Sequence, residues 1–237
     1  MSRPAARVAV LAATALLAVV ALSACAPASS PDSPSGPSTG SASAPPTEST
    51  APAAASIDIS AEAITVRDAG GAIIESYDYF QPTDEVVAGL TAVLGAPVDT
   101  PHPGGLESPP GVEHVWDGLR LYDSDTPGTV PDIPNHWVFV DAATAGGLPI
   151  GSAPGIGSAD GVQVGDLLST VTIGVTSGSP YVDPSSGLNT VVSQIGTVSI
   201  PPNPATSGER HYSVNVLSDG DTGEIARLNA PAPDFGV

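Results

Sequence analysis

Hydrophobic residues follow three different patterns along this chain of 237 residues. A mainly apolar run from Val8 to Leu22 comes first. The next stretch, from Ala26 to Ser56, contains no aromatic or large aliphatic residue. From Ile57 onward, short runs of β-branched residues alternate with polar ones. Each pattern suits a different physical role. We predict an export leader at 1–24, a spacer at 25–56 and a folded region at 57–237.

Alternation with a period of two predicts β-strands in the folded region, because successive side chains of a strand point to opposite faces. Two predicted strands, 63–66 and 72–77, are joined by Asp and Gly residues at 68–71, which predicts a β-hairpin. The proline-rich stretch 96–111 and the glycine-rich stretch 146–161 are predicted to be loops. The other predicted strands are 57–59, 112–116, 119–122, 136–142, 190–200, 211–217 and 224–228.

The segment from Thr83 to Gly95 has the pattern of an amphipathic α-helix. Its apolar residues recur at helical spacing, Thr83 can cap the first turn, and Gly95 suits a left-handed C-terminal end. A second, shorter helix is predicted to begin at Asp166, whose side chain could cap it. The residues expected to face the core from these two helices are Val86, Leu90, Val93, Leu94, Leu167, Leu168 and Val171.

These elements predict an α+β fold, in which antiparallel sheets pack with two short helices. Because helix and strands recur in the same order, we interpret the region as a degenerate tandem repeat with halves 57–145 and 146–237. A local echo favours the repeat: the segments 136–140 and 211–216, 75 residues apart, each pair a histidine with an aromatic residue. In element order alone, this arrangement resembles the helix-and-sheet repeats of secreted β-lactamase-inhibitor-like modules.

The leader ends in Leu22-Ser23-Ala24-Cys25, and Cys25 is the only cysteine of the chain. Arginines at positions 3 and 7, a short apolar run and small residues before a cleavage point describe an export signal. The tetrapeptide resembles the lipobox of bacterial lipoproteins. That resemblance implies cleavage before Cys25, a diacylglyceryl group on its sulfur, and acylation, for example with palmitate, of the new amine.

A transmembrane anchor is the alternative interpretation of the leader. The run from Val8 to Ala24 is 17 residues long and rich in alanine, at the lower edge of the roughly 17–25 residues that span a bilayer. Small residues directly before a lone cysteine favour the lipoprotein interpretation. Two or three acyl chains hold a protein stably, so we expect an anchor on the extracytoplasmic side of the cell membrane. The spacer is too polar to fold and would reach about 30 Å or further.

The charge of the chain excludes one class of partner. There is no lysine, and two of the six Lys and Arg residues lie in the leader, so four arginines remain against 25 acids, a formal charge of −21. Nucleic acids and anionic headgroups bind basic side chains that displace counterions. We therefore expect no nucleic-acid binding. The lone cysteine leaves no disulfide and no cysteine-based metal site for the folded region.

Motifs for catalysis are missing from the sequence. No lysine can serve a Ser-x-x-Lys arrangement, and no His-Glu-x-x-His motif occurs. The one Gly-x-Ser-x-Gly match, at 36–40, lies in the polar spacer, without the strand-to-helix context of a nucleophile elbow. Of the four histidines (the others are His102 and His211), only His114 and His136 could meet across neighbouring strands, and a surface or hydrogen-bonded position is the favoured interpretation for both. With 25 acids, the sequence leaves open the alternative of a carboxylate pair like that of a glycosidase. No spacing of the acids identifies such a pair. We expect a protein that is not an enzyme and has no cofactor.

Two small groups of residues remain as candidate sites. Asp219 and Asp221 belong to an Asp-x-Asp-x-Gly-like segment that resembles the start of a calcium loop, but the segment lacks the glutamate at loop position twelve, so a hairpin turn is favoured. Trp116 and Trp137 lie on the predicted sheet, where they could stack on a sugar or a partner's loop, or form the core.

Together these patterns predict an exported, lipid-anchored binding or interaction module on a flexible stalk. Its expected partners are the membrane, through the lipid on Cys25, and a cell-surface protein, glycan or small ligand. Two alternatives stay open: a cell-wall hydrolase with an unidentified acidic pair, and a calcium-dependent surface scaffold.

Overall fold

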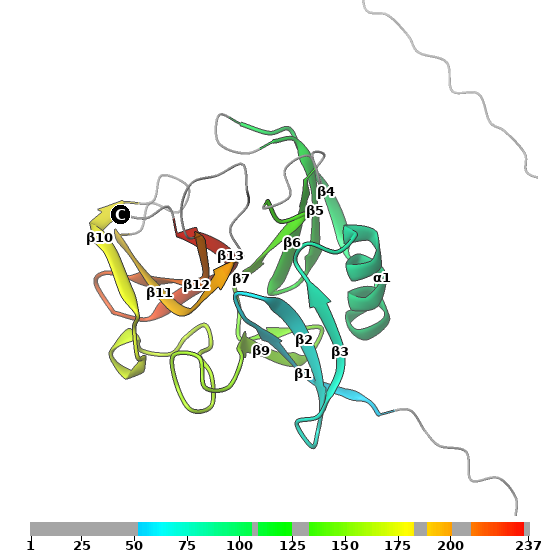
Figure 1. The fold of residues 1–237 in the computed structure, drawn as a ribbon, viewed down its shortest axis with the longest axis horizontal. Helices are drawn as coiled ribbons and strands as arrows, with labels where there is room; N and C mark the ends of the chain where they lie inside the picture. The colour runs from blue at the N-terminus through cyan, green and yellow to red at the C-terminus, as the bar shows by residue number, and fades with distance from the viewer. Residues whose placement is uncertain (1–51, 106–108, 125–132, 183–188, 201–209, 235–237) are drawn as a thin grey trace, which may run out of the picture. The chain divides into compact units, whose positions relative to one another are not determined.

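The structure is a computed structural model that describes residues 52–105, 109–124, 133–182, 189–200 and 210–234 (Figure 1). The leader, Cys25 and spacer residues 25–51 lie outside these ranges. Within them, no helix combines the length and the hydropathy that crossing a bilayer would need. Ordered backbone begins before Ile57, since the first strand starts at Ala54.

A five-stranded sheet contains the first hairpins. Its order is β3-β2-β1-β9-β8, and the strands are antiparallel except where β1 pairs with β9 in parallel. The predicted hairpin is confirmed as β2 and β3, and the carboxylate of Asp68 shapes its turn by accepting hydrogen bonds from the amides of Gly70 and Ala72. The strand bounds are β1 Ala54–Ile59, β2 Ala63–Asp68, β3 Ile73–Asp78, β8 Thr144–Ala145 and β9 Leu148–Ser152.

An antiparallel eight-stranded sheet forms the other layer, in the order β10-β11-β12-β13-β7-β6-β5-β4. It consists of two successive four-stranded meanders, β4–β7 and β10–β13, which join where β13 pairs with β7 (Figure 1). The strand bounds are β4 Val98–His102, β5 Gly111–Trp116, β6 Leu119–Ser124, β7 His136–Val140, β10 Val175–Val182, β11 Asn189–Ile200, β12 Arg210–Asp219 and β13 Ile225–Asp234.

The strands that the sequence did not predict contain proline or lie next to glycine. Both β4 and β10 are edge strands of the large sheet, and they contain Pro101 and Pro180. Proline lacks the N–H that a central strand needs, and an edge strand tolerates that loss. The short strands β8 and β9 lie around the glycines at 146 and 147, in and beside the segment predicted to be a loop.

The predicted helix is confirmed as α1 (Thr83–Leu94), with Val86 and Leu90 buried. It ends at Gly95, which has φ +87° and donates its N–H to the carbonyl of Thr91. The capping prediction was wrong. Pro82 occupies the N-cap position and no side chain caps the helix. Thr83 lies inside the first turn instead, where its hydroxyl is 3.5 Å from the carbonyl oxygen of Asn135.

The second predicted helix was also wrong, so the predicted antiparallel sheets, which are confirmed, pack with one α-helix in the described residues instead of two. Only a 3₁₀ turn, η1 (Leu168–Thr170), occurs there. The backbone around Asp166 pairs with the start of β13 instead: Gly165 donates to the carbonyl of Ile225, whose own N–H donates to Asp166. Glycines with positive φ at 161 and 165 interrupt helical geometry. The described part is therefore a β-rich fold with one α-helix.

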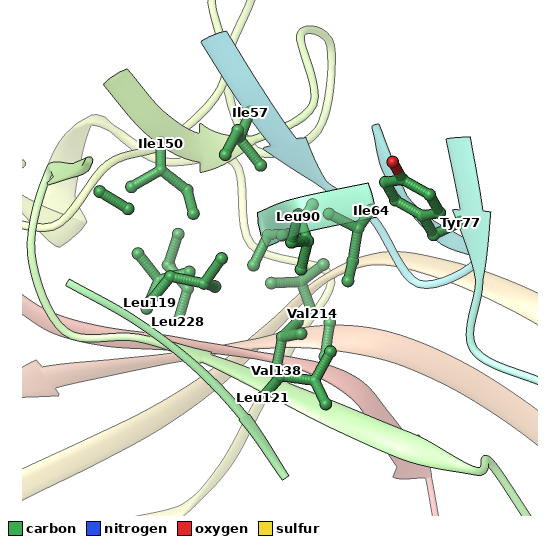
Figure 2. Packing of buried hydrophobic residues seen from close by; sticks show 14 of the residues in the cluster. Ile57, Ile64, Tyr77, Leu90, Leu119, Leu121, Val138, Ile150, Val214 and Leu228 are labelled. Carbon is green, nitrogen blue, oxygen red and sulfur yellow. The ribbon is translucent and has the colours of Figure 1, made fainter. Parts of the chain in front are cut away.

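The core lies between the two sheets. Side chains of β1 and β9, such as Ile57 and Ile150, meet Leu90 of α1 and the inner side of the large sheet, represented by Leu121 and Val214 (Figure 2). Over the second meander, the segment 153–171 contributes part of the cover: Val162 is 1% exposed, and Ile156, Val164, Leu168 and Val171 pack against the same cluster. Of the three residues of this segment predicted to face the core, Leu168 and Val171 pack against it, whereas Leu167 is 48% exposed, so that prediction was wrong.

The local echo between the two halves does not join equivalent strands. His136 opens β7, the last strand of the first meander, whereas His211 lies at the start of β12, the third strand of the second meander. A shared histidine, aromatic and valine pattern thus arises here on strands that occupy different positions in their meanders.

Candidate functional site: the outer face of the large sheet

One side of the eight-stranded sheet faces away from the core, and strand alternation defines its residues. On β6, Leu119 and Leu121 are 0% exposed within the core, so Arg120 and Tyr122 point to the opposite side. We call this side the outer face. Its side chains on the central strands are Glu113, Val115, Arg120, Tyr122, Trp137, Phe139, Val192, Gln194, Asn215, Leu217, Arg227 and Asn229.

Three aromatic residues occupy the first meander's part of the outer face. Trp137 and Tyr122 are opposite one another on β7 and β6, with ring centroids 5.8 Å apart. Tyr122 is mostly covered and donates its hydroxyl proton to the carbonyl of Pro109. Trp137 and Phe139 are partly exposed, and the guanidinium of Arg120 lies over the Phe139 ring. Accessible aromatic rings on a sheet are suited to stacking against a ligand.

The two tryptophans nominated by the sequence lie on opposite sides of the sheet. Trp116 pairs with Leu119 on the core side, is 4% exposed, and donates its indole N–H to the carbonyl of Gly95 at 2.8 Å. It thereby fastens β5 to the end of α1. Only Trp137 of the pair is on the outer face, so the two rings cannot contact the same ligand.

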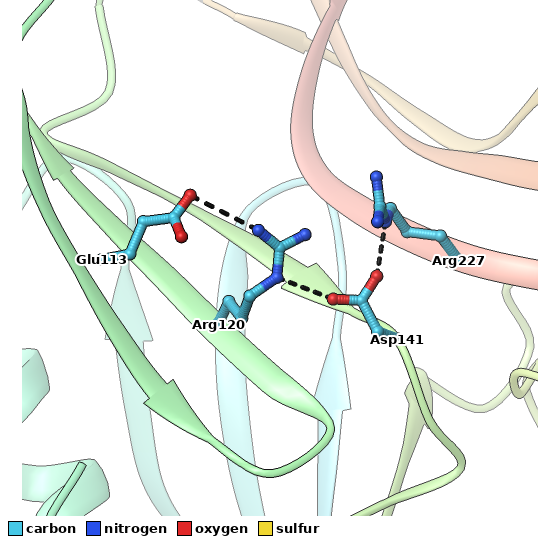
Figure 3. Close-up of polar contacts among 4 residues, drawn as sticks. All are labelled: Glu113, Arg120, Asp141 and Arg227. Carbon is cyan, nitrogen blue, oxygen red and sulfur yellow. Dashed lines mark hydrogen bonds and ion pairs between the residues drawn. The ribbon is translucent and has the colours of Figure 1, made fainter. Parts of the chain in front are cut away.

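A network of ion pairs crosses the outer face where the meanders join. Asp141, directly after β7, accepts hydrogen bonds from Nε of Arg120 at 2.7 Å and from Nε of Arg227 at 2.5 Å (Figure 3). Arg120 also approaches Glu113, with Nη1 and Oε1 3.4 Å apart, and its guanidinium lies 5.0 Å from the centroid of the Phe139 ring. Two carboxylates thus balance two guanidinium groups.

The environment of Asp141 favours its charged form. Partial burial raises the pKa of this carboxyl, but the hydrogen bonds and charges of Arg120 and Arg227 outweigh that effect and hold the pKa below its usual value. The network therefore stays ionised at neutral pH, and this part of the outer face presents no net charge to a ligand.

The second meander contributes side-chain amides to the outer face. In register across three strands, Gln194 is opposite Asn215, and Asn215 is opposite Asn229. The Oδ1 atoms of both asparagines are buried and have no hydrogen-bond partner. Sequence reasoning missed these residues, because each stands alone on its own strand and only the register brings them together.

The aspartates suspected of binding calcium form a turn. Asp219 accepts hydrogen bonds through Oδ1 from the amides of Asp221 and Thr222, at 2.7 and 3.3 Å, at the tip of the β12–β13 hairpin. Oxygen ligands used in this way shape backbone, as in other Asx turns. Among the residues that the structure describes, no group of three His, Cys, Asp or Glu side chains could hold a metal ion.

His114 and His136 do not meet, because β6 separates β5 from β7. His114 contacts Asp99, with Nδ1 and Oδ1 2.7 Å apart. His136 is 0% exposed, lies 5.6 Å from the ring of Tyr79, and its Nε2 has no hydrogen-bond partner. Burial lowers the pKa of His136 to about 4, so its imidazole is neutral in the folded protein at pH 7.

A groove of about 460 Å³ lies away from these residues, along the backbone of 155–159, 172–174 and Gly196. Its lining contains no charged side chain. Backbone N–H groups of Gly155 and Gly174 are already engaged, with Ser158 and Gln194 respectively. The groove offers the hydroxyls of Ser158 and Thr172 but no charged or aromatic side chain, so the outer face is the stronger candidate.

Comparison of the chain with protein-family models, with curated proteins and with solved structures finds no match. The functional argument for this protein consequently rests on its own residues.

Proposed function

We propose that the protein is an exported binding module, anchored on the extracytoplasmic side of the cell membrane by lipid on Cys25, and that the outer face of its large sheet is the binding face. One observation supports the binding face. Trp137 and Phe139 are partly exposed aromatic residues beside a charge-balanced network, on the side of the sheet that faces away from the core. Tryptophan, phenylalanine and arginine are enriched at recognition surfaces.

The chemistry of the outer face favours binding over hydrolysis. A glycosidase needs one carboxylic acid with a raised pKa to protonate the leaving group. Asp141 has a lowered pKa instead, and both Asp141 and Glu113 are held by Arg120. Carboxylates neutralised in this way are suited to fixing the shape of a surface.

The two meanders support a finer proposal about the folded region, that it consists of two degenerate units with halves at 57–145 and 146–237. Each unit has a four-stranded meander whose inner side is covered, by α1 in the first and by the segment around η1 in the second. The binding face would then span both units, and Asp141 lies where they meet.

Photo-cross-linking in living cells tests the binding face. A benzophenone amino acid placed at position 137 of the full chain should yield cross-linked adducts at the cell surface. The same group at Glu62, an exposed position on the β1–β2 turn, is the control. Adducts from 137 at no higher yield than from 62 would contradict the proposal. The anchor is tested separately by mass spectrometry of the native protein, which should show a diacylglyceryl group on Cys25.

A further inference from the structure

Three side-chain amides lie side by side across the second meander on the outer face. We call Gln194, Asn215 and Asn229 the amide strip. The register then places Asn229 opposite Phe139 of the first meander. Neighbouring strands are about 4.8 Å apart, so the strip is a continuous row of hydrogen-bonding groups that ends at an aromatic ring. Trp137 occupies the next outer-face position along β7.

The buried Oδ1 atoms of Asn215 and Asn229 are an unusual feature of the strip. Each lacks a hydrogen-bond partner, and a buried acceptor without a donor destabilises the folded state. Most such groups in native proteins are satisfied, so an exception calls for an explanation. A donor supplied by a ligand would remove the cost, and it would do so for two neighbouring side chains at once.

The amides can bring their oxygens toward such a ligand by rotation, which places Nδ2 in the covered position. Both asparagine side chains are partly exposed, although their Oδ1 atoms are covered. Rotation about χ2, which is broad and roughly two-fold for asparagine, exchanges the positions of Oδ1 and Nδ2. No hydrogen bond to Oδ1 is broken in that rotation, because none exists. The oxygens are therefore buried but not locked.

We propose that the amide strip, together with Phe139 and Trp137, binds a neutral oligosaccharide. This inference rests on the proposed function, because it names a ligand for the same face. Sugar hydroxyls both donate and accept hydrogen bonds, which matches the oxygen and nitrogen of an amide. The apolar C–H face of a pyranose ring matches an accessible aromatic ring.

Charge excludes an anionic ligand on this face. The guanidinium groups of Arg120 and Arg227 are engaged by Asp141, and the amides are neutral. An anionic polymer would meet a strongly acidic protein. Among the described residues of the outer face, no arginine is left without a carboxylate partner. An extended peptide fits less well, because β12 and β13 are central strands whose ladders are already paired on both sides, so the peptide could not bind by strand addition.

Calorimetry on the full chain in detergent micelles tests the inference. The probes are three neutral hexasaccharides: β-1,4-linked glucose, β-1,4-linked N-acetylglucosamine and α-1,4-linked glucose. At least one should bind with a Kd below about 1 mM. Asn215→Ala and Asn229→Ala should each weaken that binding about tenfold, which corresponds to about 1.4 kcal/mol. Gln163→Ala, which removes an exposed amide outside the sheet, should leave binding unchanged.

Thermal unfolding separates binding from a structural role. Because neither Oδ1 makes a hydrogen bond, both alanine variants should keep or slightly raise the Tm. A fall of more than about 5 °C in both variants would contradict the inference, as would full-strength sugar binding by both or no binding of any hexasaccharide at 10 mM. Cross-linking of position 137 to a surface protein, without sugar binding, would overturn the inference of a saccharide ligand but not the proposed binding face. Failure of both experiments would overturn the proposed function as well.

Discussion

Nε of Arg227 and Oδ1 of Asp141 meet at 2.5 Å across the line where the two meanders join. The contact links β13, the last strand of the chain, to the residue after β7, and Arg120 of β6 binds the other oxygen of the same carboxylate. One carboxylate therefore ties three strands together. Since two guanidinium groups depend on it, its loss should cost more than the loss of an isolated surface pair.

Asp141→Asn should lower the free energy of unfolding by about 1–2 kcal/mol, after allowing for partial solvent exposure. The amide can accept hydrogen bonds but no longer balances the charges of Arg120 and Arg227. Urea unfolding of the full chain measures the change. Asp160→Asn, which changes an exposed loop acid, is the matched control, and equal effects of the two substitutions would show that the junction does not depend on Asp141.

Acid should destabilise the protein in two separate pH ranges. Burial lowers the pKa of His136 to about 4 from 6.5, so the unfolded chain gains a proton at this residue that the folded chain lacks. Stability should fall as the pH drops from 6.5 to 4, by about 3 kcal/mol in total. Asp141 acts below this range, because its lowered pKa gives stability that is lost only as the carboxylate becomes protonated.

His136→Gln removes the titrating group and should flatten the stability curve between pH 6.5 and pH 4. His211→Gln, at a partly exposed histidine of β12, should keep the wild-type slope. Unfolding in urea at a series of pH values gives both curves. An unchanged slope for the glutamine variant at 136 would show that this imidazole is not the source.

Gly89→Ala should destabilise the protein, although alanine favours a helix by up to about 1 kcal/mol over glycine. A Cβ at this position in α1 would lie 2.0 Å from the hydroxyl oxygen of Tyr77 and 2.5 Å from its ring carbon. The tyrosine, 7% exposed, must move, at about 1–3 kcal/mol. Thermal melting measures the fall in Tm that Gly89→Ala causes in the wild-type chain and in a Tyr77→Leu chain. The fall should be smaller in the Tyr77→Leu chain.

The two tryptophans should differ in their accessibility to acrylamide. Trp137, half-buried on the outer face, should be quenched several times more strongly than Trp116, which is 4% exposed. Trp116→Phe and Trp137→Phe each leave a single indole for the measurement. Equal quenching constants would place both rings in similar environments, against the structure.

Local patterns predicted much of the fold. Period-two alternation found most strands of both sheets, and helical spacing found α1, although Thr83 is its first residue and not its cap. The prolines of β4 and β10 hid two strands because only edge position makes proline tolerable there. The apolar residues around Asp166 suggested an α-helix, but the backbone there pairs with the start of β13 and forms only a 3₁₀ turn.

The candidate site was harder to predict, because it depends on register. Trp137 was nominated from the sequence, yet its supposed partner Trp116 belongs to the core. Asn215 and Asn229 are 14 positions apart, and only the β12–β13 ladder makes them neighbours. Asp141 and Arg227 are 86 positions apart, and only the β7–β13 junction brings them together. Such contacts between strands follow from tertiary topology, which no local window of sequence contains.

Hydroxyl-radical footprinting tests most directly the claim that the outer face is the binding face. Oxidation rates are compared between the protein in intact cell envelopes and the purified full chain in detergent. The account predicts that Trp137 and Phe139 are protected several-fold in the envelope, while Tyr181, a 46% exposed ring on β10, reacts equally in both. Equal rates at Trp137 and Phe139, or protection confined to Tyr181, would contradict it.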